Sequence, residues 1–94
     1  MAKDRHLNRV ALDGEWDFSR KDELAALLGT LERDGAATID IKGVSYADST
    51  LLSVLAALRM KFAEVPITLL GPQPQIRRLL KLVQFDKLFN VVDD

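Results

Sequence analysis

The side chains best placed to do chemistry in this chain are a carboxylate and two hydroxyls in a row, Asp48, Ser49 and Thr50. They follow a short apolar, β-branched run at 36–41 and a loop at 42–48, and an apolar helical stretch begins directly after them. A hydroxyl is therefore expected at a helix start, at the edge of a sheet. A serine there is either an ordinary helix cap, which Ser and Asp both favour, or a site that carries phosphate.

The helix expected at 49–63 has two apolar sides when it is plotted at about 100° per residue. One side should press against the sheet. The opposite side, where a surface helix normally shows charge, collects Ser49, Leu52, Ser53, Ala56, Met60 and Ala63. This second side either packs under another part of the same domain or is a docking surface for a partner, where small residues permit close approach and methionine is an adaptable contact.

The remaining elements alternate between strand and helix along the chain. The sequence predicts strands at 7–13, 36–41, 67–70 and 90–92, helices at 19–34, 49–63 and 74–83, and a short turn or helix near 85–89. A turn is expected at 14–17, and Ser19 with Asp22 matches the [ST]-x-x-[DE] capping pattern of a helix start. Alternating elements of this length indicate β-α-β units. We expect one α/β domain over 1–94, with a mixed, mostly parallel sheet of four to five strands and three to four flanking helices.

Composition limits the classes of function. The 94 residues are enough for one modest core, there is no cysteine, and 13 basic against 14 acidic residues give a formal charge of −1. This balance disfavours nucleic acid as a partner. The local basic cluster of Arg77, Arg78, Lys81 and Lys87 is interpreted as the solvated face of a helix. Apolar runs are too short for membrane insertion, no secretory signal is recognised at the N-terminus, and a cytoplasmic location is expected.

Residues for catalysis or cofactor binding are not brought together by any motif. The one histidine, His6, stands near the N-terminus, and the five glycines form neither a dinucleotide fingerprint nor a phosphate loop. We therefore expect no catalytic residues, no metal site and no cofactor. The prediction is a binding module rather than an enzyme.

Several segments together resemble STAS domains, the family of bacterial anti-sigma factor antagonists. Residues 14–17 (Gly-Glu-Trp-Asp) are similar to the family's Gly-Glu-Leu-Asp motif, and 39–41 with 44–50 resemble its strand and phosphoacceptor loop. The segments 67–72, 76–80 and 85–89 resemble its closing strand, helix and terminal turn. The similarity covers nearly the whole chain in order. Leu51 departs from it, since the family usually has glycine there.

The resemblance implies a regulatory module that works by partner switching. In the family, an anti-sigma factor that is a serine kinase phosphorylates the serine after the aspartate, the unphosphorylated form binds that kinase, and a serine phosphatase resets the cycle. The resemblance makes Ser49 the phosphoacceptor, with Thr50 as the alternative. The expected switch-loop residues are Asp17, Ser45, Tyr46 and Asp48, and the expected partner-binding residues are Leu51, Leu52, Ser53, Ala56 and Met60.

Two other functions stay open. The chain also resembles STAS subunits of lipid-transporting ABC systems, which regulate an ATPase through the same helix and take no phosphate. A sensor of a small molecule or nucleotide is the third possibility, because loops at strand ends hold ligands in α/β folds.

Overall fold

The computed structural model describes residues 8–33 and 35–93. The strands are β1 (Arg9–Trp16), β2 (Ala37–Ala47), β3 (Ile67–Leu70) and β4 (Asn90–Val92). The helices are α1 (Lys21–Leu28), α2 (Ser49–Lys61) and α3 (Pro74–Leu82), with the short 3-10 helices η2 (Phe18–Arg20) and η3 (Phe85–Lys87). His6 and Leu7, the first residue of the expected first strand, lie outside the described residues.

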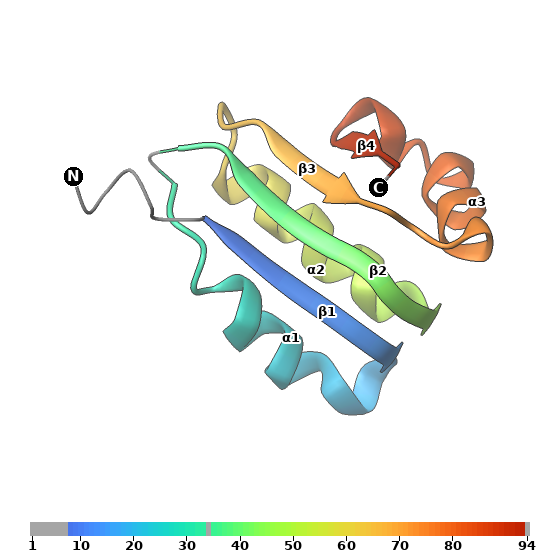
Figure 1. The fold of residues 1–94 in the computed structure, drawn as a ribbon. Helices are drawn as coiled ribbons and strands as arrows, with labels where there is room; N and C mark the ends of the chain where they lie inside the picture. The colour runs from blue at the N-terminus through green and yellow to red at the C-terminus, as the bar shows by residue number, and fades with distance from the viewer. Residues whose placement is uncertain (1–7, 34, 94) are drawn as a thin grey trace.

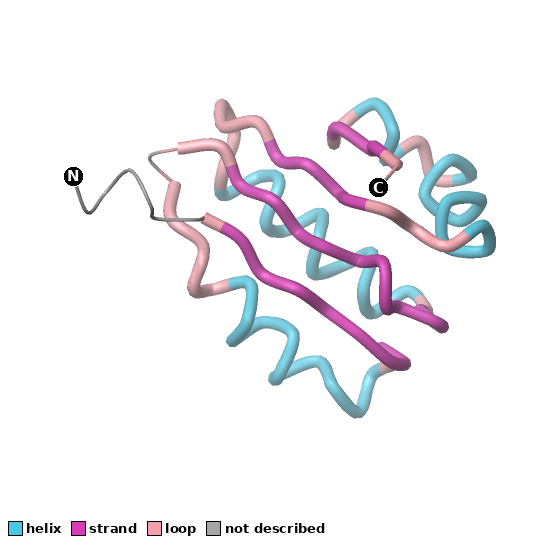
Figure 2. Tube along the Cα trace, in the orientation of Figure 1, coloured by secondary structure: helices cyan, strands magenta, loops and turns pink. Residues whose placement is uncertain are grey.

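The sheet has the strand order β1-β2-β3-β4, and its three pairings are all parallel. Each strand is joined to its neighbour through a crossover that contains a helix, as parallel pairing requires. Helices α1 and α2 lie side by side on one face of the sheet, while none of the described helices lies on the face turned toward the viewer in Figure 1 (Figures 1 and 2). The predicted α/β domain with a mostly parallel sheet is confirmed.

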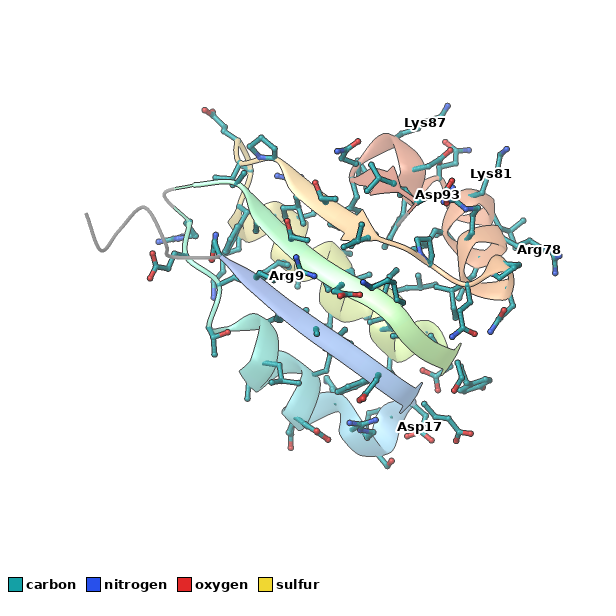
Figure 3. All side chains as sticks on the ribbon, in the orientation of Figure 1. Arg9, Asp17, Arg78, Lys81, Lys87 and Asp93 are labelled. Carbon is teal, nitrogen blue, oxygen red and sulfur yellow. The ribbon has the colours of Figure 1, made fainter. Side chains whose placement is uncertain are left out.

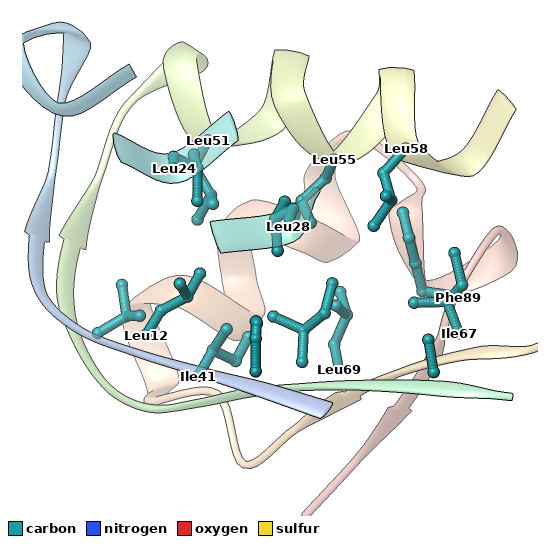
Figure 4. Packing of buried hydrophobic residues seen from close by; sticks show 14 of the residues in the cluster. Leu12, Leu24, Leu28, Ile41, Leu51, Leu55, Leu58, Ile67, Leu69 and Phe89 are labelled. Atoms are coloured by element: carbon teal, nitrogen blue, oxygen red, sulfur yellow. The ribbon is translucent and has the colours of Figure 1, made fainter. Parts of the chain in front are cut away.

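The core lies between the sheet and the helices (Figure 4). Alternate residues of each strand point to the same face, and the apolar ones point to the helices and exclude water. The buried side chains that meet there are Leu12, Ile41, Ile67 and Leu69 from the strands, Leu24, Leu28, Leu51, Leu55 and Leu58 from α1 and α2, and Phe89 from the segment before β4.

The first two strands run further than predicted. The turn expected at 14–17 is wrong, because β1 continues to Trp16, and the loop expected at 42–48 is wrong, because β2 continues to Ala47. The two extensions pair with each other across register shifts on both sides of the 13–14 segment. Gly14 makes this possible with a φ of +85°, a conformation that costs glycine little. The C-terminal ends of β1 and β2 are therefore adjacent.

Gly43 is required where these two extensions approach each other. A Cβ atom placed on Gly43 would lie 2.8 Å from the Cβ of Asp13, whereas one placed on Gly35 would meet nothing within 4 Å. We expect Gly43→Ala to lower the free energy of unfolding by about 1–3 kcal/mol through this overlap. Gly35→Ala is the matched control and should be neutral or slightly stabilising. Urea unfolding measures both, and equal stability of the two variants would contradict the close approach.

The start and end of α1 also differ from the prediction. Ser19 does not cap the helix; Asp17 is the N-cap of η2, and α1 begins only at Lys21. The helix ends at Leu28 instead of continuing to 34–35, although Leu31 is still buried. The leucine spacing that extended the predicted helix therefore reflects burial of Leu31 in the following loop.

The described residues contain no helix that is both long and apolar enough to span a bilayer.

Candidate partner-binding site

The candidate site lies where β1 and β2 end and α2 begins. Trp16 and Ala47 are register partners, and the backbone N–H of Asp48 donates to the carbonyl of Trp16 at 3.4 Å. Asp17 follows β1 directly (Figure 3). Because the end of β1 pairs with the end of β2, Asp17 lies at the same edge of the sheet as Tyr46 and Asp48. The sequence motifs at 14–17 and 44–50 thus meet in space.

Asp48 is the N-cap of α2, as its residue type predicts. Its backbone is extended, with φ −114° and ψ −163°, and its carboxylate accepts a hydrogen bond from the backbone N–H of Thr50 at 2.8 Å. Such a cap is typically worth about 1 kcal/mol of stability. Since Asp48 caps the helix, Ser49 does not have to.

The two neighbouring hydroxyls differ in access. Ser49 is the first residue of α2 and is exposed, whereas Thr50 has 9% of its surface accessible and counts as buried. Thr50 packs on the side of the helix that faces the domain. Of the two hydroxyl residues, Ser49 is therefore the more accessible to another protein.

Asp17 holds the turn between β1 and α1 in place. Its carboxylate accepts hydrogen bonds from the hydroxyl of Ser19 at 2.5 Å and from the backbone N–H of Ser19 at 3.0 Å. These two bonds, the hydroxyl bond first, lower the pKa of Asp17 below its ordinary value. Because hydrogen bonding to the charged form favours that form, Asp17 is an anion at neutral pH.

We expect Ser19→Ala to raise the pKa of Asp17 toward its ordinary value of about 3.9, because the stronger of the two bonds is lost while the backbone bond remains. The stabilisation from this pair is present above the unfolded-state pKa and disappears as the pH falls through the lower folded-state pKa. Carbon-13 NMR titration measures the change. Glu23, whose pKa is lowered by its hydrogen bonds with Arg20, is the internal control. An unchanged Asp17 pKa would contradict the assigned cause.

Ser45 and Tyr46 lie at the end of β2, and both are exposed, with 50% of Tyr46 accessible. The start of α3 is tied to this strand end, because the Gln75 side-chain amide donates to the Ser45 carbonyl at 3.0 Å and that of Gln73 donates to the Lys42 carbonyl at 3.0 Å. Tyr46 is thus presented from a fixed backbone, with its ring turned to solvent.

The expected partner-binding residues separate into two groups. Leu51 is buried against the sheet with 1% of its surface accessible (Figure 4), so its inclusion is corrected: it belongs to the core and cannot contact a partner. Ser53 is exposed, and Met60 is 80% exposed. Ala56 and Leu52 are half-buried, and Leu52 packs partly on the core.

These residues form one side of α2, here called the α2 surface and defined as Ser49, Leu52, Ser53, Ala56 and Met60. It has no charged side chain. The interpretation that this side packs inside the domain does not hold for Ser53 and Met60, which are exposed, although Leu52 and Ala56 are half-buried. An uncharged helix side with an exposed methionine can accept the apolar side chains of a partner.

Sequence reasoning missed Phe18. Its ring is 73% exposed directly after Asp17, with the ammonium of Lys21 at 5.8 Å from the ring centroid. The available signal was an aromatic residue between the turn expected at 14–17 and the helix expected from 19. Exposed aromatic side chains are enriched among the residues that dominate interface energies. Phe18 and Tyr46 give the sheet edge one aromatic ring from each strand end.

The edge of the sheet beside Ser49 is acidic. Glu15, Asp17 and Asp48 are all at the ends of β1 and β2. Arg20, three residues after Asp17, is already engaged, because its guanidinium stacks 3.5 Å over the Trp16 ring and bonds Glu23 at 3.0 Å. A phosphate on Ser49 would therefore meet the helix N-terminus on one side and carboxylates on the other.

Arg59 has a structural role at the other end of α2. Its guanidinium donates to the backbone carbonyls of Phe62, Val65 and Leu88. These bonds close the C-terminus of the helix and hold the segment after η3 beside it. No group of three potential metal ligands occurs in 8–33 and 35–93.

The chain was compared with models of known protein families. The model described as Mlab, STAS domain, matches residues 1–93, which is nearly the whole chain. No curated protein matches the chain. STAS domains are generally non-catalytic modules that bind other proteins. With its parallel four-stranded sheet, its flanking helices and this match over 1–93, the chain belongs to the STAS domain family.

Proposed function

We propose that this STAS domain is a non-catalytic regulatory module that binds a partner protein through the α2 surface and loses that partner when Ser49 is phosphorylated. The observation that carries the proposal is the position of an exposed Ser49 at the end of an exposed, uncharged helix side. By resemblance, the partner is an anti-sigma factor with serine kinase activity, a serine phosphatase reverses the modification, and both act in the cytoplasm. Binding of the partner by unphosphorylated protein frees a sigma factor for transcription.

The local energetics suit a switch that leaves the fold intact. A phosphate at a helix N-terminus meets unpaired backbone amides and the positive end of the helix dipole, which favour it by roughly 0.3–2 kcal/mol. Asp48 and Asp17 oppose it by repulsion. Because these effects partly cancel and Ser49 is exposed, modification is expected to change the free energy of unfolding little.

At an interface the same phosphate is costly. It carries about −1.5 to −2 charges and would lose its water against the apolar side chains of Leu52, Ala56 and Met60. A hundredfold loss of affinity needs only about 2.8 kcal/mol, and burying a charge without a partner can exceed that value. The proposed switch therefore acts on the complex and not on the folded state.

Buried Leu51 is compatible with this proposal. Its side chain replaces the family's usual glycine but points into the core, where 1% of it is accessible. It does not narrow the approach to the Ser49 hydroxyl, which lies on the exposed side of the same helix turn.

A second candidate uses the same surface without phosphorylation. In it, the domain docks on the ATPase of an ABC-type lipid transporter and regulates that ATPase. The observation in its favour is that the matching family model is that of Mlab and not specifically that of the anti-sigma antagonists.

Mass spectrometry separates the two candidates. The protein is mixed with ATP and, in separate reactions, a candidate anti-sigma serine kinase or a candidate transporter ATPase. The first candidate predicts transfer of one phosphoryl group from ATP to Ser49, and Ser49→Ala as the control abolishes it. A stable complex with the ATPase and no modified residue would support the second candidate instead.

A further inference from the structure

We propose that the groove between α1 and α2 binds an amphipathic carboxylate, a small molecule with an apolar tail and a single anionic head. The groove has a volume of about 390 Å³, within the range of about 300–1,000 Å³ that is typical of small-molecule sites. None of the residues that line it belongs to the α2 surface, so this site is separate from the partner-binding site and does not rest on the proposed function.

The floor of the groove is apolar. Leu28, Leu31, Leu58 and Phe62 reach it from the core, and half-buried Val54 lines it from α2. Its walls carry small residues, namely Ala25, Gly29 and Ala57. Small side chains on the two facing helices leave the space between the helices open. An apolar tail that enters this space contacts the floor and is removed from water, which favours binding.

The charged residues of the groove are both cations. Arg33 follows α1, Lys61 is the last residue of α2, and both are exposed. Since α1 and α2 each connect parallel strands, their C-terminal ends lie at the same end of the groove. Among the described residues, neither cation has an ion-pair or hydrogen-bond partner, and no carboxylate lines the groove. The groove thus combines an apolar floor with a positive end.

This distribution selects the chemistry of the ligand. A neutral apolar molecule would leave the two cations without a counterion. A multiply charged anion that has no apolar part would leave the floor of the groove unfilled. A monoanionic head beside Arg33 and Lys61 with its tail along Leu58 and Val54 satisfies both parts. A linear alkyl carboxylate is the simplest molecule with this shape.

A chain-length series tests the proposal on the protein alone. Hexanoate, octanoate and decanoate are titrated below their micellar concentrations while backbone amide shifts are followed by NMR. We expect the affinity to rise about fourfold for each methylene added, with shifts concentrated at 25–33 and 54–62. Affinity that does not depend on chain length, or shifts centred elsewhere, would overturn the proposal.

Three variants test the two parts of the groove separately. Ala57→Phe fills the groove and is expected to weaken decanoate binding at least tenfold. Lys61→Glu reverses one cation and should weaken it about fivefold, whereas Lys81→Glu, the same charge change on an exposed residue of α3, should leave it unchanged. Melting curves check that each variant is folded.

A comparison of head groups keeps the test decisive if a variant is unstable. The parent protein should bind decanoate more tightly than decanol, and Lys61→Glu should remove this preference. Equal binding of the two ligands by the parent protein, or equal effects of Lys61→Glu and Lys81→Glu, would contradict a site built around these cations.

Discussion

The Ser49→Asp variant is expected to fold like the parent protein and to bind its partner at least tenfold more weakly. Ser49 is exposed, and Asp48 already caps α2, so the new carboxylate replaces no structural contact. A negative charge at a helix N-terminus is mildly favourable in the free protein. In the complex it would be desolvated beside Leu52 and Ala56. Calorimetric titration with the candidate kinase or ATPase measures the affinity, and circular dichroism checks the fold.

Two matched variants identify the cause of that loss. Ser49→Asn has the shape of the aspartate without its charge, and Ser49→Ala removes the hydroxyl. Both are expected to bind within about threefold of the parent protein, because neither introduces a charge into the interface. The tenfold loss expected for Ser49→Asp corresponds to about 1.4 kcal/mol of binding free energy. If Asn weakens binding as much as Asp, side-chain size rather than charge controls the interface. Equal binding by all of them would contradict the phosphoswitch.

The second large effect is expected from Met60→Glu. Met60 is 80% exposed on the α2 surface, and glutamate is a good helix former, so the melting temperature should change little. A partner that covers Met60 would have to bury the new carboxylate. Burial of a charge without a partner costs more binding free energy than the loss of the thioether contact does. We expect the affinity to fall at least tenfold in the same calorimetric titration.

Leu82 supplies the control for Met60. It is 78% exposed on α3, outside the α2 surface, and Leu82→Glu makes the same kind of apolar-to-acidic change. It should leave partner binding unchanged. If Leu82→Glu weakens binding as much as Met60→Glu does, the partner covers α3 as well as or instead of α2. If Met60→Glu unfolds the domain, that side of α2 is internal.

Local sequence signals were sufficient for most of the fold. The strand expected at 67–70 and the starts of the helices expected from 49 and from 74 each depend on residues close in the chain, and each is found as predicted. The two sides of α2 also followed from the spacing of its leucines, because a 3.6-residue period fixes which residues share a face.

The errors occur where distant segments determine the structure. The ends of β1 and β2 are strands only because residues 13–16 pair with 43–47 across two register shifts. A glycine in a sequence normally indicates a turn, but Gly14 and Gly43 instead permit this close pairing. The Ser19 capping pattern failed for a similar reason, since the position of Asp17 is set by the end of β1.

The candidate site was predicted in outline. Spacing placed Asp48 and Ser49 at a helix start, but it could not separate exposed Ser49 from buried Thr50, because neighbouring helix residues differ in burial only through what packs on them. The same limitation put core residue Leu51 among the binding residues. The exposure of Phe18 depends on the course of the chain through η2, which no local pattern specified.

The most direct test is an NMR map of the partner complex. Isotope-labelled protein is titrated with the unlabelled candidate partner, and amide signals are compared with those of the free domain. The proposed function predicts that signals at 49, 52, 53, 56 and 60 shift or broaden most, and that Ser49→Asp removes these changes. Changes confined to the helix-free face of the sheet or to the groove between α1 and α2, with the α2 surface unaffected, would contradict it.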